Sequence, residues 1–101
     1  MKLSEAIRAG AALAPQVKGV FSLDGGTCAL GAAYQAIHGE PPLLKMTVPD
    51  LTRYLGVDMF QRVDCPVSHY SKHLFDAVID LNDDFNWSRE RIADWLETLG
   101  L

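Results

Sequence analysis

The stretch Cys28–Ile37 constrains the fold more than any other part of the sequence, because it is apolar around most of its helical circumference. A helix of that kind is normally buried, and its small residues let neighbouring elements approach closely. Gly31 costs about 1 kcal/mol against Ala in a helix interior, so close packing is the expected compensation. Gly39 is expected to end this helix, because glycine commonly follows the last helical residue. We therefore predict that Cys28–Ile37 is the central helix of the fold.

Apolar residues recur every three to four positions elsewhere in the chain, which predicts further helices around this one. The first begins near Ser4, which is a good N-cap residue, and is stopped by Pro15. Thr47 and Asp50 have the spacing of a capping box, and Gly56 closes the helix that they begin. These local signals predict two amphipathic helices on either side of the central one.

The second half of the chain continues the helical pattern. A short helical turn is expected at Asp58–Val63, and Ser71 is predicted to cap a helix whose apolar face extends to Leu81. Residues 82–86 form a polar stretch that predicts a solvated loop. The last helix is expected to begin at Ser88 as its N-cap.

A connector separates the first helix from the central one. Within residues 16–23, the part Val20–Leu23 favours an extended conformation, but we expect no strand for it to pair with. Asp24–Thr27 predicts a turn. A length of 101 residues is that of one small domain. The chain 1–101 is therefore predicted to be a single all-α domain, a compact bundle of about five helices around the Ala/Gly-rich one.

Charge is distributed unevenly along the chain. The net charge is −4, but residues 76–101 hold seven acids and two bases, and thus a net charge of −5. This segment would repel a polyphosphate backbone and suits a cationic partner surface. Aromatic residues beside a charged rim are typical of protein interfaces. The residues predicted to bind a partner are Asp80, Asp83, Asp84, Phe85 and Trp87.

Several short motifs occur together. They are MKLSEAIR at residues 1–8, CALGAA at 28–33, Cys65-Pro66, LND at 81–83 and WSRERIADWLE at 87–97. Taken together they resemble a group of short, uncharacterised bacterial and phage proteins, and the resemblance covers nearly the whole chain. It implies a small soluble cytoplasmic protein and names no activity. Some members of the group carry a further cysteine shortly after the Cys-Pro pair, where this chain has residues 67–69 instead.

Cysteine and histidine residues suggest one possible cofactor. Cys65, His69 and His73 would share a face if they lay on one continuous helix, and Cys28 could complete a tetrahedral Cys₂His₂ set for zinc. The spacing departs from the common two-knuckle pattern, and Pro66 interrupts the helix. Cys28 near a helix N-terminus is expected to have a lowered pKa. Zinc is the only cofactor that this pattern suggests.

Residues 47–63 have the outline of a helix-turn-helix, with Gly56 at the turn. The second helix would cover residues 59–63, and the candidate nucleic-acid contacts of the whole motif are Arg53, Gln61 and Arg62. Because Cys65-Pro66 cuts that helix short, a DNA-binding module is the alternative reading and nucleic acid the less favoured partner.

Function is best described at this stage by exclusion. The sequence shows no glycine-rich phosphate loop, no paired catalytic carboxylates and no Ser-His-Asp ordering. No run is long enough to span a membrane, and Glu5 and Arg8 interrupt the place of a signal-peptide apolar region. We therefore expect a non-enzymatic cytoplasmic protein that acts through a protein partner or as a homo-oligomer, using its acidic C-terminal surface. The alternatives are the DNA-binding module and a zinc-binding protein.

Overall fold

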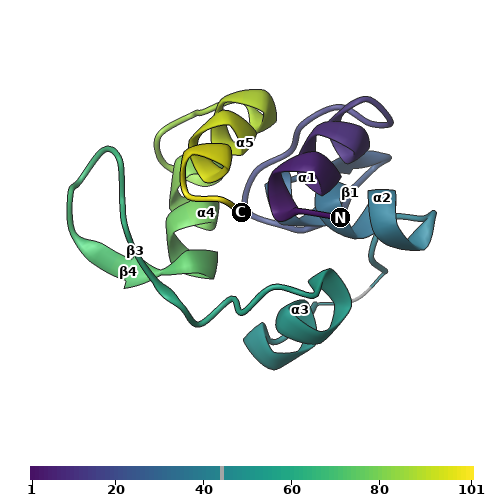
Figure 1. Ribbon diagram of the computed structural model, residues 1–101. Coiled ribbons are helices and arrows are strands. Elements are labelled where there is room, and N and C mark those ends of the chain that lie inside the picture. Colours follow the sequence, from purple (N-terminus) through teal and green to yellow (C-terminus); the bar gives the residue numbers. More distant parts are fainter. Residues whose placement is uncertain (44) are drawn as a thin grey trace.

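The computed structural model of the protein describes residues 1–43 and 45–101. Those residues form five helices and four short strands, and the strands follow one another in two pairs (Figure 1). Their bounds are α1 Leu3–Ala11, β1 Ser22–Leu23, β2 Gly26–Thr27, α2 Ala29–His38, α3 Val48–Leu55, β3 Arg62–Asp64, β4 Ser71–His73, α4 Leu74–Asp83 and α5 Arg89–Thr98. The strands form two antiparallel two-stranded sheets. The all-α prediction is therefore wrong, and the fold is a small α+β arrangement.

Helix α2 packs as its composition predicts. Residues 29–33 are fully buried, and α1 crosses this part of the helix closely. A Cβ atom added to Gly10 of α1 would lie 1.8 Å from the carbonyl oxygen of Ala32. Only glycine at position 10 allows this crossing. At its other end α2 stops at Gly39, whose φ of 84° is the left-handed conformation that favours glycine.

The first hairpin occupies a stretch that was predicted to be connector and turn. Ser22 pairs with Thr27, and Leu23 pairs with Gly26. Asp24 and Gly25 between them have φ values of 49° and 84°, as the two central residues of a type I′ hairpin turn do. The extended piece thus has a strand to pair with, because the chain reverses within two residues.

The second hairpin overlaps the end of Asp58–Val63, which is predicted to be a short helical turn: a turn ends at Gln61, and β3 begins at Arg62. Arg62, Val63 and Asp64 pair with His73, Lys72 and Ser71 respectively. Only Val63 of the three β3 residues faces the core, so the pattern has a period of two rather than 3.6. Ser71 therefore lies in β4 and caps nothing, and α4 begins after His73 instead.

Three of the predicted helix starts can be compared with the structure. The capping box of Thr47 and Asp50 is present, and Ser88 accepts a hydrogen bond from the amide of Arg91. Ser4 is not an N-cap. It is buried inside α1, and its amide donates to the carbonyl oxygen of Leu101 at 3.1 Å. The cap prediction at Ser4 is wrong because α1 starts at Leu3.

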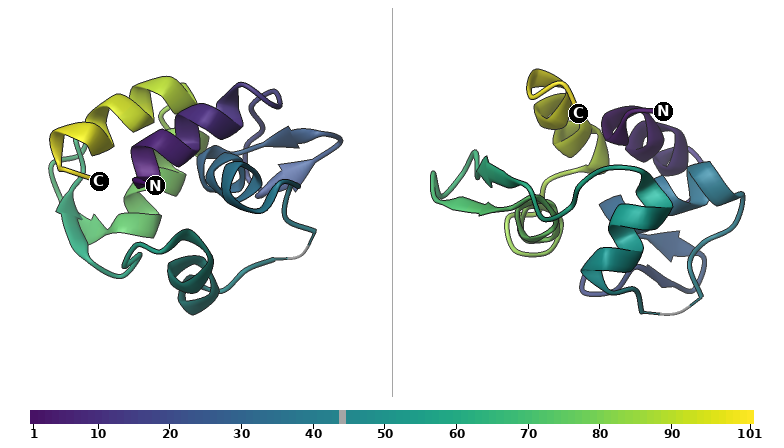
Figure 2. Two further views of the ribbon diagram at one scale, coloured as in Figure 1. Left: turned by 45° about the vertical axis from the view of Figure 1, so that its right-hand side comes forward. Right: turned by 60° about the horizontal axis from the view of Figure 1, so that its bottom comes forward.

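The elements form two regions (Figures 1 and 2). Helix α1 packs against both α2 and α5, and β2 contacts α2. Helix α3 contacts α2, whereas the β3–β4 hairpin contacts α4. The β3–β4 hairpin projects furthest from the helices, as the right-hand view of Figure 2 shows. Among the described residues no helix combines the length and apolar character needed to cross a membrane.

Candidate functional site

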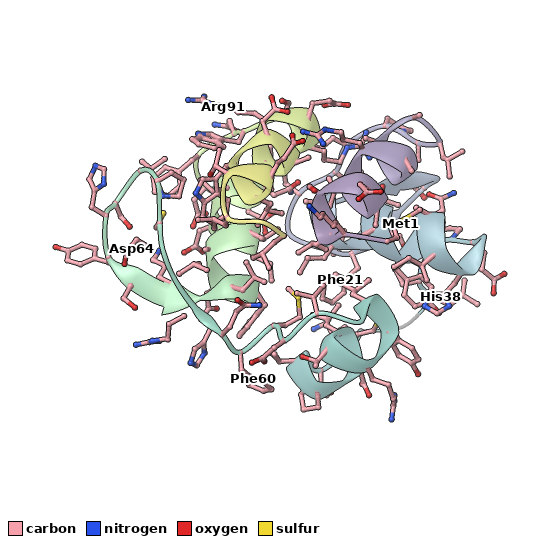
Figure 3. The ribbon with its side chains drawn as sticks, in the orientation of Figure 1. Met1, Phe21, His38, Phe60, Asp64 and Arg91 are labelled. Atoms are coloured by element: carbon pink, nitrogen blue, oxygen red, sulfur yellow. The ribbon has the colours of Figure 1, made fainter. Side chains whose placement is uncertain are left out.

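A cleft of about 320 Å³ lies where four separate segments of the chain meet. Its walls are residues 19–22, the start of α2 at 28–30, residues 42, 43, 45 and 46, and the α4 residues 78, 79, 82 and 83. Figure 3 labels Phe21, which belongs to the first of these walls. A volume of this size falls within the range of ligand pockets, and apolar walls with a few polar groups are typical of them. The cleft is therefore the best candidate for a binding site.

The wall made by residues 19–22 is bound directly to the start of α2. The amide of Cys28 donates to the carbonyl oxygen of Phe21 at 3.2 Å. A Cβ atom on Gly31 would lie 2.0 Å from that same oxygen. Gly31 thus lets the backbone of Phe21 rest against the first turn of α2. Ser22 holds the opposite wall, because its hydroxyl donates to the carbonyl oxygen of Pro42 at 2.6 Å.

Asn82 joins α4 to the start of α2 and to residues 16 and 17, which precede the first wall of the cleft. Its Oδ1 accepts from the Ala29 amide at 3.1 Å and from Gln16 Nε2 at 2.8 Å. Its Nδ2 donates to the carbonyl oxygen of Val17 at 2.9 Å and to Asp83 Oδ1 at 2.8 Å. All the hydrogen-bonding capacity of this buried amide is used. The prediction of a solvated loop at Asn82 is wrong, although the position follows Leu74 and Val78 on the buried face of α4.

Arg89 joins the start of α5 to the end of α1, to the segment after it and to β2. This role was not predicted from the sequence. Its side chain is buried, and its two terminal nitrogens donate to the carbonyl oxygens of Ala11, Ala14, Pro15 and Thr27, and to Thr27 Oγ1. The Nε atom has no hydrogen-bond partner among the described residues. Burial lowers the pKa of this guanidinium. The signal that could have revealed it is spacing, since position 89 shares a helix face with Ile92 and Leu96.

The predicted partner-binding residues lie beside the cleft or close to it in the chain. Asp83 lines the cleft and is held by Asn82. Asp84 is exposed, and Phe85 is 38% exposed. These residues lie at the end of α4 and in the loop that follows it.

The other two members of that predicted set have contacts within the chain. Asp80 forms an ion pair with Lys72. Trp87 is half-buried, and the guanidinium of Arg91 lies 3.9 Å from the centre of its ring. Of the predicted acidic residues, only Asp83, which is half-buried, lines the cleft, and the exposed Asp84 follows it in the chain.

Cys28 lies in the cleft as a protonated thiol. Burial raises its pKa and Asp83 acts in the same direction, whereas the amides of Gly31 and Leu30 oppose the shift. The prediction of a lowered pKa is therefore wrong, because loss of solvent outweighs the helix N-terminus. The Sγ atom accepts a hydrogen bond from the Gly31 amide at 3.4 Å and caps α2.

The predicted zinc ligands do not gather. Cys65 follows β3, His69 is exposed in the hairpin loop, and His73 ends β4 with its ring near Phe60. The helix that would have aligned them is absent from this segment, which forms a hairpin instead. Within residues 1–43 and 45–101, no group of three His, Cys, Asp or Glu side chains is placed to hold a metal ion.

Cys65 differs from Cys28 in its environment, although both are buried free thiols. Burial raises the pKa of Cys65, but hydrogen bonds from the hydroxyl and amide of Ser68, together with the charge of Lys72, outweigh it and lower the pKa. The thiol with more thiolate character is thus in the hairpin loop rather than in the cleft.

The helix-turn-helix outline is not completed. Helix α3 forms as predicted, but residues 62–64 are a strand, so the second helix is absent. Arg53 is paired with Asp50, and Gln61 donates to the carbonyl oxygen of Asp58. Arg62 is exposed on the hairpin. These three residues do not form the reading helix that the alternative requires.

Comparison with known proteins found no matching family model, no matching curated protein and no matching solved structure. These comparisons do not bear on the resemblance to the bacterial and phage group, which stays a hypothesis. Function must therefore be argued from the geometry of the cleft.

Proposed function

We propose that the chain acts as a protein-binding module whose cleft receives an apolar side chain of a partner, while Asp83 and Asp84 face a basic residue beside that side chain. The observation that carries the proposal is the position of Asp83. It belongs both to the acidic C-terminal segment and to the lining of the apolar cleft. One partner segment could therefore contact both features at once.

The chemistry of the cleft supports binding rather than a reaction. Its thiol, Cys28, has a raised pKa and so lacks the thiolate that a nucleophile requires. The remaining polar groups of the lining include Asn82, whose hydrogen bonds are already made within the chain, and Ser22, which donates to Pro42. These groups hold the walls in place, and a well-packed, rigid pocket favours the binding of a partner's anchor residue.

Exposed apolar residues at the cleft also support a protein partner. Leu43 is 86% exposed and Val20 is 41% exposed, and both line the cleft. Leu43 has the largest exposed fraction among the large apolar side chains of the described residues. Apolar groups rimmed by charge are typical of the anchor region of an interface. The charged residues of the lining are Asp83 and Lys45, and Asp84 adds an exposed carboxylate directly after Asp83 in the chain.

The test uses substitutions that leave the core intact. Leu43→Asp places a charge at the cleft, and Leu13→Asp is the matched control, because Leu13 is 60% exposed and does not line the cleft.

The partner is first captured by crosslinking. A light-activated crosslinking side chain is placed at position 43 or 13, and the crosslinked products are compared in cells that produce the chain. The proposal predicts a discrete protein adduct from position 43 and none of that mass from position 13.

The affinity of the captured partner then measures the contributions of the apolar cleft and of the acidic residues separately. Leu43→Asp and Asp84→Lys should each weaken binding of the purified partner by about tenfold or more, while Leu13→Asp leaves it unchanged. Equal binding by the wild type, Leu43→Asp and Asp84→Lys would show that this surface is not the one used. A small molecule that occupies the cleft and leaves no protein adduct would also contradict the proposal.

A further inference from the structure

One edge of the β3–β4 hairpin has its main-chain groups directed away from the partner strand. The amide of Cys65 donates to Tyr70, and the amide of Leu74 donates to Gln61. In an antiparallel pair the residues that exchange hydrogen bonds alternate with residues that do not. The main-chain groups of residues 61, 63 and 65 therefore form hydrogen bonds with the β4 side of the hairpin. The amide and carbonyl groups of Arg62 and Asp64 point to the free edge.

The side chains along this edge carry opposite charges. Arg62 and Asp64 are both exposed and lie on the same face of the hairpin, since they are two residues apart in a strand. Val63 between them faces the opposite side and packs partly against the core. No salt bridge involves either charged side chain among the described residues. The edge thus offers both unpaired main-chain groups and unpaired charges.

We propose that this edge pairs with the same edge of a second copy of the chain, antiparallel, about a twofold axis at Val63. In that register Arg62 lies opposite Asp64 of the second copy, and Asp64 lies opposite Arg62 of the second copy. Each opposed pair exchanges two main-chain hydrogen bonds, because these are the residues whose groups point outward. The twofold axis makes the two ion pairs identical, and the two hairpins become one four-stranded sheet.

The charge pattern selects this register against others. Charged side chains on an edge strand normally block pairing with another chain. A parallel pairing in register would place Arg62 against Arg62 and Asp64 against Asp64, which is unfavourable. The antiparallel register about Val63 turns both charges into attractive cross-strand pairs. It also brings Phe60, which is 45% exposed, opposite Pro66 of the second copy, where the missing proline amide ends the pairing.

The accessibility of the edge agrees with this arrangement. The hairpin projects from the helices in the right-hand view of Figure 2, and Figure 3 places Asp64 on it, far from Arg91 on α5. The cleft lining includes no residue of the hairpin. Pairing through β3 therefore leaves the proposed binding site open, and the two proposals can succeed or fail separately.

The test is the oligomeric state of the purified chain over a range of concentrations, measured by sedimentation velocity. The wild type should show a monomer–dimer equilibrium that weakens as salt is added, because exposed charges are screened. Arg62→Asp and Asp64→Arg should each lower the association constant at least about tenfold, since each turns two attractive pairs into repulsive ones. The double variant Arg62→Asp/Asp64→Arg exchanges the charges and should restore dimerisation.

The restoration separates charge pairing from damage to the hairpin, because a misfolded hairpin would not regain its dimer when the second charge is reversed. Arg91→Asp on α5 serves as the control for a change of net charge and should dimerise like the wild type. A wild type that stays monomeric at the highest concentration that remains in solution overturns the proposal. So does a double variant that dimerises no better than the single ones.

Discussion

The two hairpins of this chain, at residues 22–27 and 62–73, lie in opposite environments. In β1–β2 the residues Gly26 and Thr27 are buried. Strand β2 pairs on both of its edges, because Thr27 also forms a β-bridge with Gln16. In β3–β4 the residues Arg62 and Asp64 are exposed. A two-stranded hairpin is at best marginally stable in isolation, so each must be supported from outside.

The support differs between the two regions. Long polar side chains from α4 and α5 hold the region of β1–β2 in place, with Arg89 bonded directly to Thr27 and Asn82 bonded to Val17. The β3–β4 hairpin is fastened mainly where β4 continues into α4 and where Val63 packs on the core. The stability of the interior hairpin thus depends on a few residues that are distant in the chain, whereas that of the outer hairpin depends on its own chain neighbours.

The largest effect is expected from Arg89→Met, which removes the guanidinium that joins α5 to β2 and to the end of α1. The carbonyl oxygens of Ala11 and Ala14 and the hydroxyl of Thr27 lose the guanidinium as their donor, so we expect the free energy of unfolding to fall by about 3 kcal/mol or more. Urea denaturation measures this change. Arg91→Met on the same helix is the control, because Arg91 is exposed, and it should have a much smaller effect. Equal losses of unfolding free energy in Arg89→Met and Arg91→Met would contradict the role of Arg89 in supporting the β1–β2 region.

A smaller effect is expected from Gly31→Ala at the wall of the cleft. In an ordinary helix interior this change would stabilise by about 1 kcal/mol. Here the added Cβ meets the Phe21 carbonyl oxygen at 2.0 Å, so the backbone must move, and we expect a loss of about 1–3 kcal/mol. Thermal unfolding followed by circular dichroism reports the sign. A gain in stability would show that residues 19–22 are not held against α2.

The smallest effect is expected in the outer region, at the capping box of α3. Hydrogen bonds from the Thr47 amide and hydroxyl, and the nearby charge of Arg53, lower the pKa of Asp50 below its usual 3.8. A carboxyl whose pKa is lower in the folded state stabilises the fold above its unfolded pKa, and that contribution disappears as the pH falls through the folded pKa.

The corresponding experiment compares unfolding of the wild type and Asp50→Asn at neutral pH and at about pH 3, on either side of the ordinary carboxyl range. The stability advantage of the wild type should be present at neutral pH and shrink in acid. Glu40→Gln is the control, because Glu40 is exposed and lies outside the capping box. A difference between wild type and Asp50→Asn that does not change with pH would contradict the assignment.

Local signals in the sequence were sufficient for several of the helices. The composition of Cys28–Ile37, the spacing of Thr47 and Asp50, and the cap at Ser88 each predicted the element that the structure contains. These signals work because helix caps and buried faces are set by residues three or four positions apart. Apart from the extended piece at Val20–Leu23, the strands were not predicted, because each has only two or three residues, too few to show a period.

Long-range contacts account for the rest of what was missed. Asp83 was predicted as part of a partner surface, but the cleft beside it joins segments that are distant in the chain, such as those of Val20 and Leu43. No spacing rule brings such segments together. Arg89 and Asn82 carried a usable signal, because each continues an apolar helix face. A polar residue on such a face indicates a buried hydrogen-bond network.

Native-state hydrogen exchange tests the contrast between the two hairpins most directly. The Thr27 amide, bonded to Pro15 at 2.8 Å inside the structure, should exchange only when the whole chain unfolds. In dilute solution the amides of Arg62 and Asp64 should exchange orders of magnitude faster than that of Thr27. Rapid exchange at Thr27, or protection of the Arg62 and Asp64 amides in the isolated monomer, would contradict the account.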